Sequence, residues 1–295
     1  MLHKDGNEGI SLLHRDPNTR ETAPDVESMQ HAITRETLAG YGIRGGYTVA
    51  SVSDVTSRGS GLGASSAYTV GLLNAVLNST DVPYIMTPSP RDLADLACEV
   101  EMIRCGFPIG KQDQYAAAYG GFRLYQFFAG GHVTEAKIRA DHHTLINLNR
   151  NLLLLNTGIS RSANHILEKQ KTAMLDESKF ALVRSARDRA FEAERLLTFG
   201  KIDDFGALLH EAWMEKRNIV SDISTTKIDD VYEAARNGGA IGGKVLGAGG
   251  GGFMIFYAPF SDHEKIKNQV LEVAGPEAKF VDFSFTQNGS RVGLS

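Results

Sequence analysis

A short segment rich in glycine and serine carries the first sign of chemistry in this sequence. Three glycines alternate with other residues between a strand-like run and a helix-like run, and three serines accompany them. Glycines allow the backbone to approach a ligand closely and to turn amide N–H groups toward it, and a helix N-terminus favours anions. A serine here can simply cap the helix, but capping accounts for one serine and not for three. The residues that we predict to bind a phosphate group are Gly59, Ser60, Gly61, Leu62, Gly63, Ala64, Ser65 and Ser66.

A second group of residues combines two glutamates with an aspartate a short distance further on. Carboxylates are ligands that Mg²⁺ prefers, and a carboxylate can also accept the proton of a reacting hydroxyl. Glu99 and Glu101 both lie at the border of the apolar stripe of a predicted helix, so helical phase alone does not choose between them. Asp113 follows a Gly-Phe-Pro-Ile-Gly turn, where the alternative to a catalytic role is an aspartate that caps the turn.

A third segment contains 9 of the 31 glycines, between positions 238 and 252. Its match to G-x-x-x-x-G-K has Val245 where a P-loop needs serine or threonine for magnesium. Its match to G-x-G-x-x-G is followed by a strand-like run, whereas a dinucleotide fingerprint must open a helix. Both nucleotide motifs are therefore excluded by context, and the aliphatic flanks predict an ordered loop between two buried strands.

The elements that must position these residues follow from hydrophobic periodicity. A helix over 92–105 is predicted by a stripe that includes Leu93, Val100 and Ile103, with Ser89-Pro90 as its start signal. The other predicted helices cover 66–77, 162–172, 176–198, 203–220, 227–237 and 261–273, and the predicted strands cover 47–55, 151–156, 240–246, 252–258 and 278–286. This order has no fixed repeat and favours an α+β protein with a domain boundary near residue 148.

Composition excludes several classes of protein. The chain has 295 residues, 42% of them hydrophobic and 22% charged, which is typical of a compact protein. Its net charge of −4 gives no general attraction to nucleic acid or to an anionic membrane, so neither is expected as a partner. No apolar stretch is long enough to span a bilayer, and the first residues lack the apolar core of a signal peptide, so we expect a cytoplasmic protein. Cys98 and Cys105 lie about 10 Å apart on a helix, beyond disulfide reach.

Three blocks, at 59–68, 101–114 and 244–252, together resemble the GHMP kinase superfamily. The resemblance implies an α+β fold of two domains, an N-terminal α+β domain over 1–148 and a ferredoxin-like C-terminal domain over 149–295. It also implies ATP-dependent phosphorylation of a small molecule. Two segments, 109–115 and 157–163, are similar to the branch that phosphorylates D-glycero-D-manno-heptose 7-phosphate at the anomeric carbon. A kinase of the fucose or galactose type and a non-catalytic relative are the alternatives.

The resemblance also assigns roles to individual residues. It implies Ser65 and Glu101 as Mg²⁺ ligands, because Glu101 lies twelve positions before Asp113 as in the sugar kinases, and Asp113 as the residue that accepts the hydroxyl proton. It places Gly247, Gly249 and Gly250 against the nucleotide, where an added side chain would occupy the space of the phosphates. Arg161 is predicted to hold the phosphate of the substrate, and Lys111 either lies near the transferred phosphate or faces solvent. ATP, Mg²⁺ and a sugar phosphate are the expected ligands. A homodimer is the oligomeric state that we consider for this protein.

One part of the superfamily pattern does not occur in this sequence. The resemblance runs from about residue 25 to the end, without the usual opening strand hairpin and its Gly-Gly-Gly-Thr-Asp-like sugar-binding segment. We therefore expect the sheet that includes residues 47–55 to expose an unpaired edge. We further expect this chain to bind ATP but to phosphorylate sugar poorly, and an added upstream segment to raise kcat/KM.

Overall fold

The computed structural model describes residues 1–4, 8–14, 19–54, 60–79, 82, 87–160 and 163–293. The chain forms two compact units: unit 1 contains Met1–Arg58, Gly63–Gly121 and Thr286–Ser295, and unit 2 contains Gly59–Leu62 and Phe122–Phe285. The predicted division into 1–148 and 149–295 does not coincide with these units. Phe122 packs edge to face on Phe285 with 4.6 Å between the ring centroids, which ties the segment after residue 121 to unit 2.

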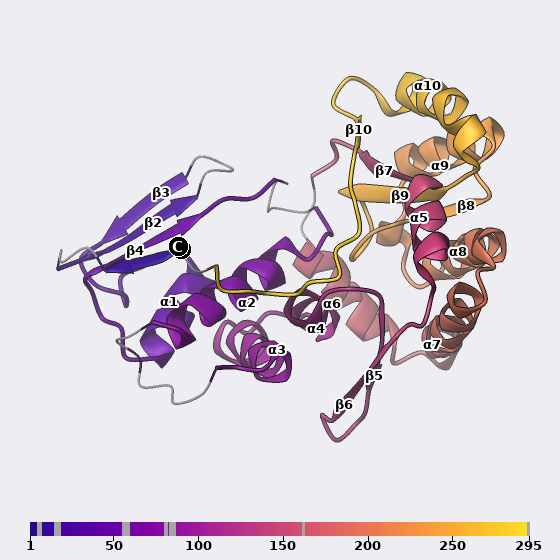
Figure 1. Cartoon of the computed structure of the whole chain (residues 1–295). Helices are drawn as coiled ribbons and strands as arrows, with labels where there is room; N and C mark the ends of the chain where they lie inside the picture. Colours follow the sequence, from indigo (N-terminus) through magenta and orange to yellow (C-terminus); the bar gives the residue numbers. More distant parts are fainter. Residues whose placement is uncertain are drawn as a thin grey trace. The chain divides into compact units, whose positions relative to one another are not determined.

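The sheet of unit 1 has the strand order β1-β4-β2-β3 (Figure 1). Its strands are β1 (Leu2–Lys4), β2 (Ile10–His14), β3 (Thr19–Ala23) and β4 (Tyr47–Ser51). β4 pairs with β1 on one side and with β2 on the other, so the expected unpaired edge is not at this strand. Helices α1 (Ala32–Gly40) and α2 (Ala64–Leu77) supply Leu38, Leu72 and Val76 to the core under the sheet.

A change of helix type occurs between α3 and the segment that follows it. α3 (Pro90–Cys98) begins at the predicted start signal Ser89-Pro90, where Ser89 and Asp92 form a capping box, and the chain continues as a π-helix over Glu99–Arg104. The prediction that Ile103 belongs to the buried stripe is wrong, since this side chain is 76% exposed. The reason is that a π-helix has a wider turn than an α-helix, so residues beyond Cys98 no longer follow the 3.6-residue phase.

The last residues of unit 1 return to helix α4 (Gln112–Tyr119). The N–H of Ser290 donates to the carbonyl of Ala117 at 3.1 Å, and the N–H of Gly121 donates to the carbonyl of Thr286 at 3.1 Å. The side-chain amide of Asn74 on α2 donates to the hydroxyl of Ser290 at 2.9 Å. Residues 286–290 therefore join α2 to α4 by hydrogen bonds, and Figure 1 shows this segment running along both helices.

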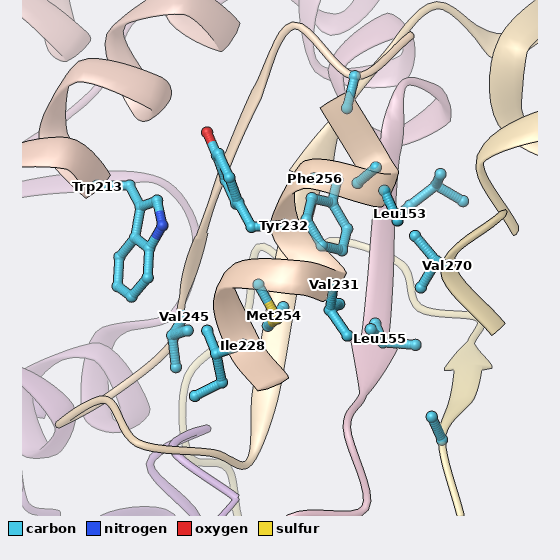
Figure 2. Close-up of a cluster of buried hydrophobic side chains, with 14 of the residues drawn as sticks. Leu153, Leu155, Trp213, Ile228, Val231, Tyr232, Val245, Met254, Phe256 and Val270 are labelled. Carbon is cyan, nitrogen blue, oxygen red and sulfur yellow. The ribbon is translucent and has the colours of Figure 1, made fainter. Parts of the chain in front are cut away.

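Unit 2 contains an antiparallel sheet with the strand order β10-β7-β9-β8. Its strands are β7 (Leu152–Asn156), β8 (Gly242–Val245), β9 (Phe253–Tyr257) and β10 (Lys279–Val281). With α9 (Thr226–Gly238) after β7 and α10 (His263–Ala274) after β9, they form the β-α-β-β-α-β order of a ferredoxin-like domain. Figure 2 shows this core, where the ring of Tyr232 on α9 lies between the rings of Trp213 and Phe256.

The remaining elements of unit 2 are one hairpin, several helices and two short 3₁₀ turns. They are β5 (Arg123–Phe127), β6 (Val133–Lys137), α5 (His142–Arg150), α6 (Ala163–Ala173), α7 (Glu177–Thr198) and α8 (Ile202–Lys216), with 3₁₀ turns at Ser221–Ile223 and Phe260–Asp262. Among the described residues, no helix combines the length and the apolar character needed to cross a bilayer.

Candidate active site

Helix α2 begins without a side-chain cap. Its N-cap is Gly63, in the left-handed conformation at φ 69°, which a residue with a side chain rarely adopts. The serines that follow do not cap the helix; both donate a hydrogen bond to Glu101, Ser65 to Oε1 at 2.5 Å and Ser66 to Oε2 at 2.8 Å. The first N–H groups of α2 therefore have no side-chain acceptor at the N-cap, which is the arrangement that suits an anion at a helix start.

Glu101 is fully buried and lies on the π-helix. A third donor, the side-chain amide of Gln114 on α4, reaches its Oε2 at 2.6 Å. The other glutamate that the sequence left open, Glu99, is exposed and accepts two hydrogen bonds from Arg104. The structure thus brings Glu101, and not Glu99, to the two serines at the start of α2. π-helical segments recur at functional sites, where they redirect a side chain as here.

Asp113 lies in the first turn of α4, next to the same helix start. A Cβ added to Gly63 would lie 3.4 Å from the carboxyl carbon of Asp113, which places this carboxylate against the last glycine of the predicted phosphate loop. Burial raises the pKa of Asp113, and the charge of Glu101 raises it further. Lys111 is the N-cap of the same helix, two positions before Asp113.

The surroundings of Glu101 fit a magnesium ion. No lysine, arginine or histidine among the described residues forms an ion pair with this buried carboxylate, and a buried charge needs compensation. Glu101 and Ser65 supply oxygen ligands, as Mg²⁺ prefers. The described part of the chain holds no cluster of three or more His, Cys, Asp or Glu side chains that could bind a metal. An ion here would take its other ligands from water and substrate phosphates, which is usual for Mg²⁺.

The glycine loop between β8 and β9 is held by contacts within unit 2. The N–H of Gly250 donates to the carbonyl of Ile223 at 2.8 Å, and the N–H of Phe253 donates to the carbonyl of Ser60 at 3.1 Å. Ser60 and the end of the glycine loop are therefore directly joined. The hydroxyl of Ser60 accepts the N–H of Leu62 at 3.3 Å, and Gly61 between them has φ 75°.

Two side chains that the sequence did not indicate hold the carbonyls of this loop. The ammonium of Lys216 donates to the carbonyl of Gly247 at 2.5 Å, and the amide of Gln170 donates to the carbonyl of Ala248 at 2.8 Å. Lys216 ends α8 and Gln170 lies on α6, far from the loop in sequence. Both residues occupy positions typical of the polar side of a helix, so the sequence does not indicate that they contact the loop.

Gly249 has a structural reason to be glycine. Its φ is 104°, and an added Cβ would lie 2.8 Å from the backbone oxygen of Ile223. The sequence-based expectation that a side chain here would meet the phosphates is therefore incomplete, because it would first meet Ile223.

We expect Gly249→Ala to destabilise the protein more than Gly275→Ala. Gly275 has φ 93° and ψ 178° but no atom within 4 Å of an added Cβ, so its replacement costs only backbone strain, roughly 1–3 kcal/mol. At Gly249 the clash should add about 1–3 kcal/mol. Urea denaturation of both variants measures the difference; equal losses would show that the loop shifts without cost.

Two predicted site residues, Gly59 and Arg161, lie outside the described residues. The others fall into two groups. Unit 1 brings together Gly63, Ala64, Ser65, Ser66, Glu101, Lys111 and Asp113, and unit 2 contains Ser60, Gly61, Leu62, Gly247, Gly249 and Gly250.

Comparison with known proteins shows the family to which the chain belongs. Residues 28–121 match the family model described as "GHMP kinases N terminal domain", and residues 189–274 match "GHMP kinases C terminal". The chain therefore belongs to the GHMP kinases, and it is a phosphotransferase whose acceptor is a hydroxyl group.

Among its relatives is the D-glycero-alpha-D-manno-heptose 7-phosphate kinase of Campylobacter jejuni, which is 31% identical over 243 residues. That match covers 82% of this chain and 69% of the relative. The solved structure of a D-glycero-D-manno-heptose 1-phosphate kinase from Bacteriodes thetaiotaomicron has a TM-score of 0.71 at 20% identity, covering 98% of this chain and 84% of that one. The solved structure of Lactococcus lactis galactokinase has a TM-score of 0.73 at 16% identity, and the match covers 98% of this chain and 85% of the galactokinase. At these identities the solved structures establish the fold.

Proposed function

We propose that this protein transfers the γ-phosphate of ATP, with Mg²⁺, to the anomeric hydroxyl of a sugar phosphate. The observation that carries the proposal is the meeting of Asp113 and Glu101 at the uncapped start of α2. This arrangement combines a helix start suited to an anion, the Glu101 carboxylate as a ligand for a cation, and the Asp113 carboxylate beside the helix start. Phosphoryl transfer needs these three components and little else from the protein.

Each component has a task that follows from its surroundings. The free N–H groups at the start of α2 bind the phosphates of the nucleotide. Ser65 and Glu101 would hold a Mg²⁺ ion, and the ion would supply positive charge that neutralises the phosphates. Asp113 accepts the proton of the attacking hydroxyl, and its raised pKa brings its basicity closer to neutral pH than that of an ordinary aspartate.

The substrate that we propose is D-glycero-D-manno-heptose 7-phosphate, giving the 1,7-bisphosphate and ADP. The support for it is the Campylobacter jejuni relative together with the segments 109–115 and 157–163. Arg161 and Lys111 are the candidates for binding the substrate's own phosphate, since a guanidinium or ammonium pairs well with phosphate.

A phosphorus NMR assay with ATP, Mg²⁺ and a panel of sugars tests this function. We expect a new anomeric phosphate signal and ADP with heptose 7-phosphate, and much slower turnover with fucose, galactose and mevalonate. Faster turnover of fucose or galactose would replace the proposed substrate. ATP binding without turnover of any acceptor would favour a non-catalytic relative.

A further inference from the structure

Gln114 is a buried glutamine beside the metal-binding carboxylate, and the proposed function leaves it without a task. Its side chain is fully buried, and its amide nitrogen donates to Glu101 Oε2 at 2.6 Å. Its other polar atom, Oε1, is buried and has no hydrogen-bond partner among the described residues. This arrangement of Gln114 needs an explanation, because a buried hydrogen-bond acceptor without a partner lowers the stability of the protein.

The charge of Glu101 explains which way the amide of Gln114 is turned. The opposite orientation would place the carbonyl oxygen of Gln114 against a carboxylate oxygen, and two acceptors repel each other. The bond to an ionised carboxylate is charge-assisted and stronger than a bond between neutral groups. An apolar residue of similar volume would leave no orphan acceptor, so the glutamine is accounted for by what it does to Glu101.

The two oxygens of Glu101 have different partners. Oε1 is bonded by Ser65, which is itself the other predicted metal ligand, whereas Oε2 is bonded by Ser66 and Gln114. Binding of a cation by Ser65 and Glu101 would replace the hydrogen bond from Ser65 to Oε1, because one oxygen of each residue would then serve the cation. The two bonds to Oε2 can persist through this exchange, and they fix the plane of the carboxylate.

From this geometry we propose that Gln114 is a positioning residue: together with Ser66 it holds Oε2 of Glu101 so that Oε1 faces the cation. The inference rests on the proposed role of Glu101 as a metal ligand. Partners of this kind, which bind a ligand and not the metal, typically contribute 10- to 100-fold to metal affinity. Asp113 and Gln114 are neighbours on α4, so the same helix places one side chain beside Gly63 and the next on Glu101.

The variant Gln114→Met keeps most of the side-chain volume and removes both polar atoms. We expect Mn²⁺ binding to the protein saturated with a non-hydrolysable ATP analogue, measured by electron paramagnetic resonance, to weaken roughly tenfold or more. In kinetics the apparent constant for Mg²⁺ should rise similarly, while kcat at saturating Mg²⁺ changes much less. Gln269→Met is the matched control, because Gln269 on α10 lies in unit 2 and also has a buried Oε1 with no hydrogen-bond partner among the described residues.

A double-mutant cycle shows whether Gln114 acts through Glu101 even if turnover is lost. Without metal or nucleotide, Gln114→Met should lower the urea midpoint, because a buried carboxylate loses a donor. In the Glu101→Gln background the same replacement should cost clearly less. Additive losses, or unchanged Mn²⁺ binding in Gln114→Met, would overturn the inference. Failure of the parent protein to bind Mn²⁺ with nucleotide would instead refute the proposed metal role of Glu101.

Discussion

The variant Asp113→Asn should bind ATP as well as the parent protein but turn over roughly 100-fold more slowly, as is usual when a general base is lost. The amide keeps the shape of the side chain beside Gly63 and cannot accept the proton of the hydroxyl. Phosphoryl transfer with a loose transition state asks less of a base than other reactions, so this loss is close to the upper limit. Single-turnover kinetics together with calorimetric ATP titration separate the chemical step from binding.

The same variant should be more stable than the parent at neutral pH. Burial and the charge of Glu101 raise the pKa of Asp113, so the folded state binds its proton more tightly than the unfolded state. Between the pKa of Asp113 in the unfolded state and its raised pKa in the folded state, the free energy of unfolding falls as the pH rises. Above the raised pKa this destabilisation is complete. Asparagine has no such loss. Thermal unfolding from pH 3 to pH 8 should show the two proteins diverging above about pH 4, the ordinary range of aspartate.

Turnover within a factor of about two of the parent would remove Asp113 from the mechanism, since that factor is under roughly 0.5 kcal/mol of barrier. An unchanged pH dependence of stability would show that its carboxylate is better solvated than its burial implies. Because the two measurements are independent, a catalytic role and a perturbed environment are tested separately.

Replacing Glu101 with Gln should abolish most activity at physiological Mg²⁺, with kcat/KM reduced roughly 100-fold or more, comparable to the loss of a group that stabilises charge in the transition state. The amide lacks the negative charge of the carboxylate, and its NH2 end cannot accept the hydrogen bonds that Ser65, or Ser66 and Gln114, donate to an oxygen of Glu101. Mn²⁺ binding in the presence of an ATP analogue is the direct measurement.

Glu99→Gln is the natural comparison, because Glu99 is only two positions away and carries the same charge. It is exposed and bonded to Arg104, and an exposed ion pair contributes about 0–1 kcal/mol. We expect kcat/KM and Mn²⁺ affinity of Glu99→Gln to stay close to those of the parent. Equal effects of the two replacements would mean that net negative charge, and not a ligand at Glu101, supports catalysis.

Much of this protein is determined by local patterns in the sequence. Most helices and strands of unit 2 after residue 150 lie close to their predicted bounds, because long amphipathic helices and continuous apolar strands give strong periodic signals. The hairpin of β5 and β6 and the helix α5 are not among the predicted elements, and β10 ends at Val281 instead of at residue 286. The three blocks that resemble the superfamily stand out by residue type, because a backbone that approaches phosphate closely requires glycine and a cation such as Mg²⁺ prefers carboxylates. The family and the α+β fold follow from these blocks and are confirmed.

Other features depend on contacts between residues far apart in the chain. The strands β1, β2 and β3 were not predicted, since they are only three to five residues long and are stabilised by pairing in the sheet. The return of residues 286–290 to α4, which places the last residues in unit 1, leaves no periodic signal either.

The choice between Glu99 and Glu101 shows most clearly where sequence-based prediction ends and tertiary structure is needed. An ideal α-helix makes the two glutamates equivalent, and only the resemblance to a family selected Glu101. In the structure the π-helix breaks that symmetry, burying Glu101 where Ser65, Ser66 and Gln114 converge on it and leaving Glu99 exposed. Residue types and spacing therefore determined which side chains could take part in chemistry, whereas the tertiary structure decided which carboxylate lies at the start of α2, because burial and hydrogen bonding are set by neighbours distant in sequence.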